Sequence, residues 1–322
     1  MTTTEVDDRG GGGRTDQGGR PGQGSRTDRP SEAQDQATRR GSLFWVWHVL
    51  RQNPLTALGA AMVLGLVLAA LLAPWLAPFP GDGGVDVHPK SQLLAPSLEH
   101  PFGTDELGRD LFSRVVYGAR ISLFTGSLVI GLALLIGIPL GAAAGYLGGF
   151  VDEVIMRFVD IVLSFPPLLL ATALAAMLGS SLVNAMIAVA VAWWPWYARI
   201  MRGQAVALRE RGYVEAARAG GVGTLRILTR HIIANSLPPL IVQASMDFGS
   251  VILTSASLSF LGLGAQPPQP EWGLLISTGR TFFLTNWWYV TFPGLAILVT
   301  AVAFNLVGDG LREYLDPRLR SV

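Results

Sequence analysis

The chain has 322 residues, of which 50% are hydrophobic and only 15% are charged, with a formal net charge of +1 and no cysteine. Soluble domains carry about 25% charged residues, so this composition predicts an integral membrane protein. The lack of cysteine excludes disulfides, thiol catalysis and thiolate metal sites. The four histidines are scattered without metal-ligand spacing, so no metal site is predicted.

The first eighty residues divide into a polar tract and an apolar span. Residues 1–40 contain almost no apolar side chains and cannot bury enough surface to offset their ordering entropy, which predicts a disordered tail. Residues 41–80 are predicted to hold an aromatic anchor, Phe44–Val49, and a first membrane span, Leu55–Pro78. The span is long enough because about 20 helical residues cross the hydrocarbon core.

Residues 81–120 are predicted to form a loop that ends in an amphipathic interfacial helix. Its charged side chains are crowded together: Asp105, Glu106, Arg109, Asp110, Arg114 and Arg120. Such a cluster could serve acid/base catalysis or hold a metal. Local salt bridges that hold the helix explain it better, because His100 has no second ligand at sensible spacing.

Residues 121–310 are predicted to contain five further spans, which gives an all-α membrane protein with six in total. The predicted spans are Ile121–Phe150, Ile161–Leu178, Leu182–Ala198, Pro239–Leu263 and Trp287–Val307. The uncharged run from Ile161 to Ala198 would be about 57 Å long as one helix, so we expect a hairpin there. Pro166 and Pro167 should kink the third span, either for a moving or pore-lining helix or for plain packing.

A polar segment, Tyr213–Pro239, separates the fourth and fifth spans. Its first part has good helix formers and is stopped by Gly220 and Gly221. A second amphipathic helix should follow and end near Pro238 and Pro239. Two amphipathic helices between spans predict a docking element at the membrane surface.

Arginines set the expected orientation of the spans. The loop of residues 199–238 and the flanks of both termini are rich in arginine, whereas the basic residues of the 81–120 loop are offset by acids. The positive-inside rule therefore predicts that both termini, the 199–238 loop and the charged tail of residues 311–322 are cytoplasmic.

Two polar side chains inside predicted spans are candidate functional residues. Asp247 is costly at that position and is expected either to bond a neighbouring helix or to line a substrate path. Asn305, like Asn184, is expected to form a hydrogen bond between helices.

The segment Glu215-Ala216-Ala217, followed by Gly221, resembles the EAA loop of bacterial ABC importer permeases. Further segments resemble the dipeptide, oligopeptide and nickel branch of that family, DppC/OppC-like: His100–Leu123, Ala256–Gly264 and Asp316-Pro317-Arg318. Together the matches extend over about Phe44–Arg320. Two departures stand out, Ala234 where the family commonly has proline and Ser255 where it often has glutamate.

The resemblance implies a type I (MetI-like) permease fold with a cytoplasmic coupling helix that docks into an ATPase. The residues it assigns to docking are Tyr213, Glu215, Ala216, Ala217, Arg218 and Gly221. It also implies a location in the bacterial cytoplasmic membrane. The implied partners are a homologous second permease, two cytoplasmic ATPases and an extracytoplasmic binding protein, with no nucleic acid.

The function implied is ATP-driven import of di- or oligopeptides by alternating access, with nickel chelates or oligosaccharides as the alternative. No phosphate loop of the GxxxxGK[ST] type is present, so no cofactor is expected on this chain and ATP would be used by the partner ATPases. A membrane enzyme or a passive channel would be rival functions, and no motif in the sequence favours either.

Overall fold

The computed structural model describes residues 53–315, which all lie in one unit, His48–Val322. The predicted tail, the Phe44–Val49 anchor and the Asp316-Pro317-Arg318 match lie outside the described residues. Within residues 53–315 every regular element is a helix. The helices are α2 (Pro54–Leu71), α3 (Ala73–Leu76), α4 (Leu111–Leu147), α5 (Gly149–Leu163), α6 (Pro167–Leu178), α7 (Leu182–Arg209), α8 (Gly212–Ala219), α9 (Thr224–Ile227), α10 (Ala234–Phe260), α11 (Trp272–Gly279) and α12 (Trp288–Leu315).

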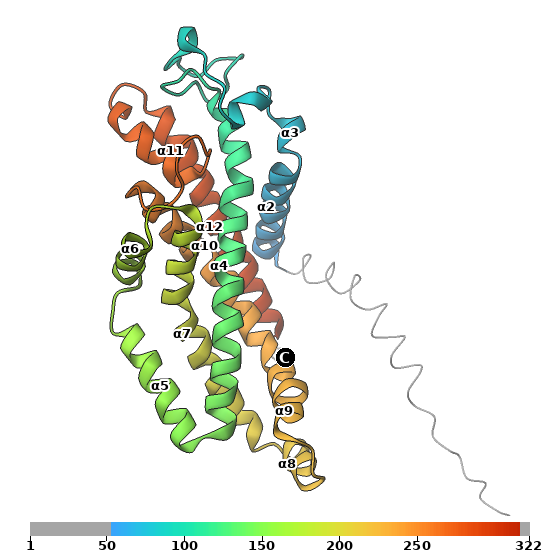
Figure 1. Ribbon diagram of the computed structural model, residues 1–322. Coiled ribbons are helices and arrows are strands. Elements are labelled where there is room, and N and C mark those ends of the chain that lie inside the picture. Colours follow the sequence, from blue (N-terminus) through green and yellow to red (C-terminus); the bar gives the residue numbers. More distant parts are fainter. Residues whose placement is uncertain (1–52, 316–322) are drawn as a thin grey trace, which may run out of the picture. The chain divides into compact units, whose positions relative to one another are not determined.

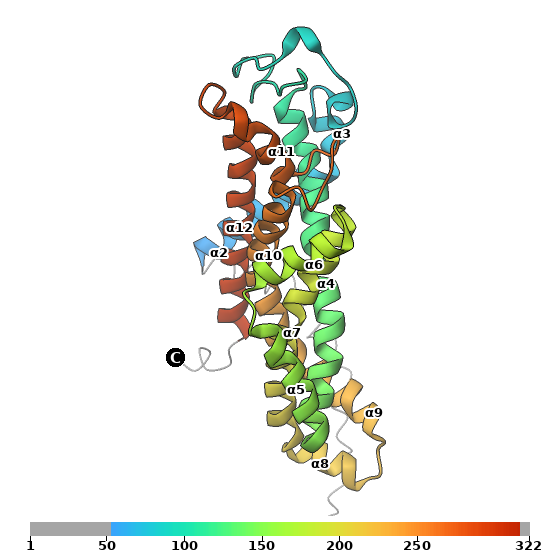
Figure 2. The same cartoon turned by 60° about the vertical axis from the view of Figure 1, so that its left-hand side comes forward.

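The long helices pack side by side, with α4 along α7, α10 along α12, and α2 against α12 (Figures 1 and 2). Glycines allow the closest of these contacts. Gly137, Gly141 and Gly145 lie at four-residue intervals on α4, and a Cβ at each would collide with α7. This confirms that small residues of the second predicted span serve close packing, as is usual between membrane helices.

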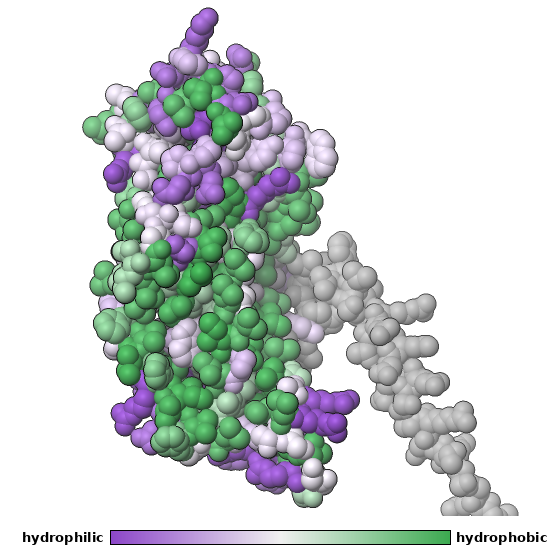
Figure 3. All heavy atoms as spheres, viewed as in Figure 1, coloured by the Kyte–Doolittle hydropathy of each residue, from purple (hydrophilic) through white to green (hydrophobic). Residues whose placement is uncertain are grey.

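Four of the described helices are long and apolar enough to cross a membrane, or up to five if the bent α5–α6 pair is one span. The four are Pro54–Leu71, Leu111–Leu147, Thr224–Phe260 and Trp288–Tyr314. The face drawn in Figure 3 is apolar through its middle and polar at both ends. The α7 helix, which contains the predicted fourth span, is not among the four because it carries tryptophans in its middle and arginines in its second half.

The interfacial helix predicted before the second span is not a separate element. Residues 81–110 form an irregular loop with two short 3-10 turns, Pro80–Gly83 and Pro89–Ser91. Asp110 then caps α4, because its carboxylate accepts a hydrogen bond from the Ser113 amide at 2.7 Å. The helical pattern seen before Ile121 is therefore the first part of α4.

The predicted third span, Ile161–Leu178, is wrong as a continuous helix. The chain breaks between α5 and α6, and the two helices differ in direction by 89°. Pro166 is extended, with φ −56° and ψ 128°, and Pro167 begins α6. A residue before proline is driven out of the helical region, so Pro-Pro produces a break rather than the expected kink.

The predicted end of the second amphipathic helix at Pro238 and Pro239 is also wrong. Helical structure runs without a break from Thr224 to Phe260. A π-helical segment, Leu228–Ile233, lies just before the prolines. Local π geometry and side chains that bond to backbone carbonyls let a helix continue through proline. Here Asn235 donates to the carbonyl of His231 at 2.6 Å.

The α4–α7 contact yields a stability prediction. Replacing Gly141 by valine should lower stability by about 1–3 kcal/mol, because the added atoms meet the backbone of Ala198. The change should appear as a lower thermal midpoint of the detergent-purified protein. The matched control is Gly131→Ala on the same helix, where a Cβ meets nothing within 4 Å and the midpoint should be unchanged or higher. Equal midpoints for the two variants would contradict the packing argument.

Candidate functional site

The short helix α8 is almost entirely exposed and is held by one apolar anchor. Val214 is fully buried and packs in a cluster with Tyr146, Met201 and Ile227. On the opposite face lie Gly212, Glu215, Ala216 and Ala219, all exposed. Their spacing of three and four residues places them on one side of the helix. The helix therefore presents a smooth face of small residues with one carboxylate.

Gly221 ends α8 in a way that only glycine adopts without strain. Its φ is +76°, in the left-handed region. The Gly221 amide donates to the carbonyl of Arg218, and the Val222 amide donates to that of Ala217, both at 3.0 Å. This pair of bonds is a Schellman motif, which satisfies the last carbonyls of the helix. The fixed spacing between the Glu-Ala-Ala segment and Gly221 thus sets the length of α8.

Two of the predicted docking residues make contacts within the chain. The Arg218 guanidinium lies 5.5 Å from the centroid of the Tyr146 ring, and the Tyr213 ring lies 6.1 Å from that of His231. Glu215 makes no hydrogen bond or ion pair with residues 53–315. The free surface of α8 therefore centres on Glu215 and Ala216, while Tyr213 and Arg218 also hold the helix in place.

The end of α7 that leads into α8 is tied to α5 by ion pairs. Arg202 binds Asp152 through two nitrogens, at 2.5 and 2.6 Å, and Arg199 binds Asp160 at 2.7 Å. Sequence reasoning used these arginines only for orientation and missed the pairs. The signal available in the sequence was the spacing of these charges. Asp152 and Asp160 lie eight residues apart on an amphipathic helix, and Arg199 and Arg202 lie about one turn apart on a later one.

The charged cluster before α4 is a buried network that fixes the 81–110 loop. Asp105 is fully buried and accepts a bond from Arg109 Nε at 2.6 Å, with Arg114 Nε at 3.5 Å. Asp110 pairs with His100 at 3.0 Å, and Asp82 accepts a bond from the Asp110 amide at 2.7 Å. Local salt bridges are confirmed as the arrangement of these charges, although they hold a loop rather than an interfacial helix.

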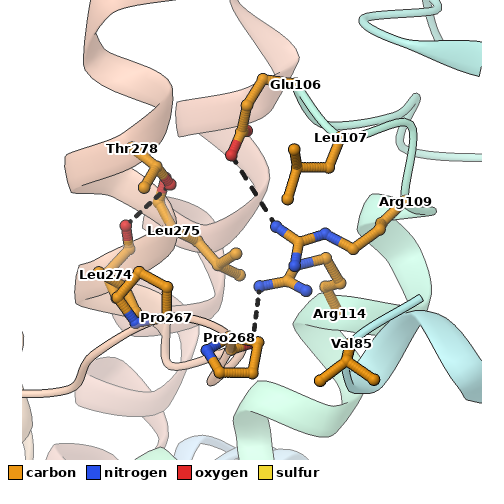
Figure 4. A pocket seen from close by; sticks show the side chains of 10 residues that line it. All are labelled: Val85, Glu106, Leu107, Arg109, Arg114, Pro267, Pro268, Leu274, Leu275 and Thr278. Carbon is orange, nitrogen blue, oxygen red and sulfur yellow. Dashed lines mark hydrogen bonds and ion pairs between the residues drawn. The ribbon is translucent and has the colours of Figure 1, made fainter. Parts of the chain in front are cut away.

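A pocket of about 370 Å³ adjoins this network (Figure 4). Arg109 and Arg114 line it from one side, and Pro267, Pro268, Leu274, Leu275 and Thr278 from another. Glu106, which also lines the pocket, accepts a hydrogen bond from Tyr289 and lies 3.9 Å from Arg109. Since Asp105 and Glu106 offset the two arginines, the pocket carries little net charge.

Glu271 fixes the start of α11 beside this pocket. The sequence analysis did not identify it as a structural residue. Its carboxylate accepts bonds from the amides of Gly273 and Leu274, at 3.0 and 2.9 Å, and so caps α11. Burial raises the pKa of this carboxyl, and the two amides partly offset that effect. The indole of Trp272 donates to the carbonyl of Val115 at 2.9 Å, which joins α11 to α4.

The polar residues predicted inside spans differ in their surroundings. Asp247 is half-buried on α10 and accepts a bond from Gln243 of the same helix at 2.9 Å, not from a neighbouring helix's Asn or Ser. Asn305 is exposed on α12. Asn184 on α7 donates to the carbonyls of Leu178 and Gly179 at the end of α6, which confirms a bond between helices. Pro166 and Pro167 lie at the α5–α6 break, far along the chain from α8.

Two family comparisons match this chain. Residues 137–321 match the family described as the binding-protein-dependent transport system inner membrane component. Residues 44–96 match the N-terminal TM domain of oligopeptide transport permease C. The first match covers the C-terminal third of α4 and every described helix after it.

Curated relatives match along most of their length. The chain is 49% identical over 281 residues to the probable D,D-dipeptide transport system permease protein DdpC of Escherichia coli strain K12, covering 87% of this chain and 93% of that protein. It is 44% identical to the di/tripeptide transport system permease protein DppC of Pseudomonas aeruginosa strain UCBPP-PA14, covering 85% and 92%. It is 43% identical to the glutathione transport system permease protein GsiD of Pectobacterium atrosepticum, covering 86% and 91%.

A solved structure supports the fold. A chain of the MetNI methionine ABC transporter, described in inward facing conformations, superposes with a TM-score of 0.52 at 19% identity, covering 64% of this chain and 98% of that one. At this identity the likeness establishes the fold alone. The expected all-helical, MetI-like fold is confirmed.

The ion pair between α5 and α7 can be tested by a charge exchange. Arg202→Glu and Asp152→Arg should each lower the thermal midpoint, by an amount that corresponds to about 1 kcal/mol or less because the pair is partly exposed. The double variant should recover part of the loss, since it restores opposite charges. Losses that simply add in the double variant would contradict the pairing.

Proposed function

The chain belongs to the family of binding-protein-dependent transport system inner membrane components, and from that premise we propose that it is the permease subunit of an ATP-driven peptide importer. A permease of this family is a transport subunit and not an enzyme. The names of its relatives refer to D,D-dipeptides, di- and tripeptides and glutathione. They favour di- or oligopeptides as the substrate over nickel chelates or oligosaccharides.

We propose that six spans cross the membrane. Five would be α2, α4, the bent α5–α6 pair, α10 with its π-helical start, and α12, in agreement with helix length and composition. The sixth would be α7, since its 28 helical residues are about 42 Å long and exceed the hydrocarbon core. With six spans, the arginine-rich 199–238 loop and both termini would be cytoplasmic.

The observation that carries the proposal is the geometry of α8. An exposed helix with one buried anchor and a smooth face of small residues can enter a narrow protein groove with little side-chain clash. Glu215, which has no partner among residues 53–315, would meet a basic residue of the ATPase. ATP would be bound and hydrolysed by the ATPase subunits and not by this chain.

The neighbours of α8 suggest how movement would reach the membrane. It follows α7 directly and precedes the helical rod Thr224–Phe260, and it contacts both α7 and α9. A push on α8 would therefore move two spans together. The homologous second permease would lie across the translocation path, and a binding protein would deliver peptide at the outer face beside the 81–110 loop.

Substitutions on the free face of α8 test this proposal. Glu215→Arg reverses the only charge on that face, and Gly221→Val adds about 1–2 kcal/mol of backbone strain at a left-handed position. Each is expected to reduce co-purification of the ATPase at least several-fold and to abolish ATP-driven peptide uptake. Abundance in the membrane should remain unchanged, because both positions are exposed.

Leu98→Arg serves as the matched control on the opposite side of the membrane. Leu98 is fully exposed in the 81–110 loop, so this variant should bind the ATPase like the unaltered protein. Undiminished ATPase binding and uptake in both α8 variants would refute docking through α8.

A further inference from the structure

One side of α10 is polar although α10 belongs to a membrane-spanning helix. Gln243, Asp247, Ser250, Thr254 and Ser257 follow one another at spacings of four and three residues, which places them on one side of the helix. Ser250 is exposed, and the other four are half-buried. These five residues, termed the polar stripe, extend over about 21 Å of helix length.

The opposite faces of α10 bury apolar residues against the bundle. Phe248 stacks on Phe304 of α12 at 3.8 Å between ring centroids, and Gly249 lies against Ala301. Leu240, Val251 and Leu258 are fully or almost fully buried. Ile241 and Leu253 are exposed on other sides of the helix, so the polar residues are confined to one side of α10.

A lipid-facing helix of the same protein has the reverse character. In α2 no exposed position carries a polar side chain, and Leu58, Leu64 and Leu68 are among its exposed residues. Polar and ionisable groups within spans are costly in lipid and face a bundle interior or a water-filled cavity. The polar stripe is therefore suited to water and not to lipid.

The stripe offers mainly hydrogen-bond acceptors. Thr254 and Ser257 donate their hydroxyl hydrogens to backbone carbonyls one turn earlier, both at 2.8 Å, which leaves their oxygens as outward-facing acceptors. Asp247 adds the only carboxylate. The hydroxyl of Tyr197, a fully buried residue of α7, interacts electrostatically with Asp247 but forms no hydrogen bond of normal geometry with the described residues. The cluster around Asp247 thus holds a buried polar group that lacks a partner.

Resting on the proposed function, we propose that the polar stripe is this chain's wall of the translocation path and that Asp247 receives the cationic amino group of the passing peptide. A carboxylate with flanking hydroxyl oxygens matches an ammonium group and peptide N–H groups, which are all donors. The Tyr197 hydroxyl would complete the site by donating to the same carboxylate. The stripe's orientation also explains why Ser250 stays exposed within this chain.

The lack of cysteine in this chain permits a direct test of water access. Single cysteines are introduced by Ser250→Cys, which is exposed, and Thr254→Cys, which is half-buried, with the exposed Leu64→Cys and Leu68→Cys on α2 as controls. The complete importer in membranes, without ATP, is treated with a charged, membrane-impermeant thiol reagent, and labelling of this chain is followed by mass. The two stripe positions should react at least about tenfold faster than the α2 positions. Equal, slow reaction at all four would mean that lipid or the second permease covers the stripe, and would overturn the proposal.

The role of Asp247 is tested by protection of the same labels. A saturating dipeptide with a free amino terminus should slow labelling of the cysteine at position 254 by about tenfold, because the bound peptide blocks access of the reagent. A charged hydrogen bond is strong enough to give a change of this size. The protection should disappear in the Asp247→Asn background and return with Asp247→Glu. A role in helix packing alone would leave protection unchanged in Asp247→Asn, and that result would refute the amino-group site.

Both tests can fail independently of the proposed function. Co-purification of the ATPase and ATP-driven uptake by the cysteine variants report on the importer itself. Unreactive stripe cysteines in an importer that still takes up peptide would reject only the stripe. If the stripe cysteines react although no ATPase co-purifies with the chain, coupling through α8 is rejected and the stripe proposal is retained.

Discussion

The close contact between the backbones of α4 and α7 is the constraint on which the other features of the described structure depend. Glycines at four-residue intervals on α4 remove the side chains that would separate the two helices. In lipid, helices gain little from hydrophobic burial against each other, so close packing supplies much of their association. The N-terminus of α4 carries the buried charge network, and the end of α7 carries α8. One helix pair therefore joins the two polar ends of the bundle.

The helix α8 is positioned by few interactions, and these leave one of its faces free. Val214 anchors it, Arg218 covers Tyr146, and Gly221 ends it in a Schellman motif. The ion pairs of Arg199 and Arg202 with α5 hold the preceding end of α7. A helix held in this way can transmit force as a unit. The π-helical segment and Pro238-Pro239 lie between α8 and the membrane-spanning part of α10. The helix would bend most easily at these points.

Much of the fold could be predicted from the sequence because charge-free runs and glycine stops act locally. The end of α8 at Gly220-Gly221 follows from backbone sterics alone. Pro166 and Pro167 predicted a kink, but not the full break between α5 and α6. Continuity through Pro238 and Pro239 could not be predicted, since it depends on a π-helical adjustment and on bonds such as that from Asn235 to His231. The buried network was equally hidden, because Asp82 and Asp110 meet only when the loop folds back over α4.

The candidate site residues divide in the same way. The local structure around Glu215, Ala216 and Gly221 could be predicted because these residues belong to one short helix and its glycine stop. Val214 could not be singled out, because its role depends on Tyr146 and Ile227 from distant segments. The surroundings of Asp247 required the position of Tyr197 on another helix. Intrahelical patterns are thus visible in the sequence, whereas contacts between helices are not.

The central claim is that the free face of α8 touches the ATPase, and photo-crosslinking tests it most directly. A benzophenone attached to the single cysteine of Ala216→Cys in the complete importer is predicted to capture the ATPase subunit upon illumination. The same label on Leu98→Cys, in the 81–110 loop, should capture none. Failure of the probe at position 216 to capture the ATPase, in an importer that still contains it and still transports, would contradict the account.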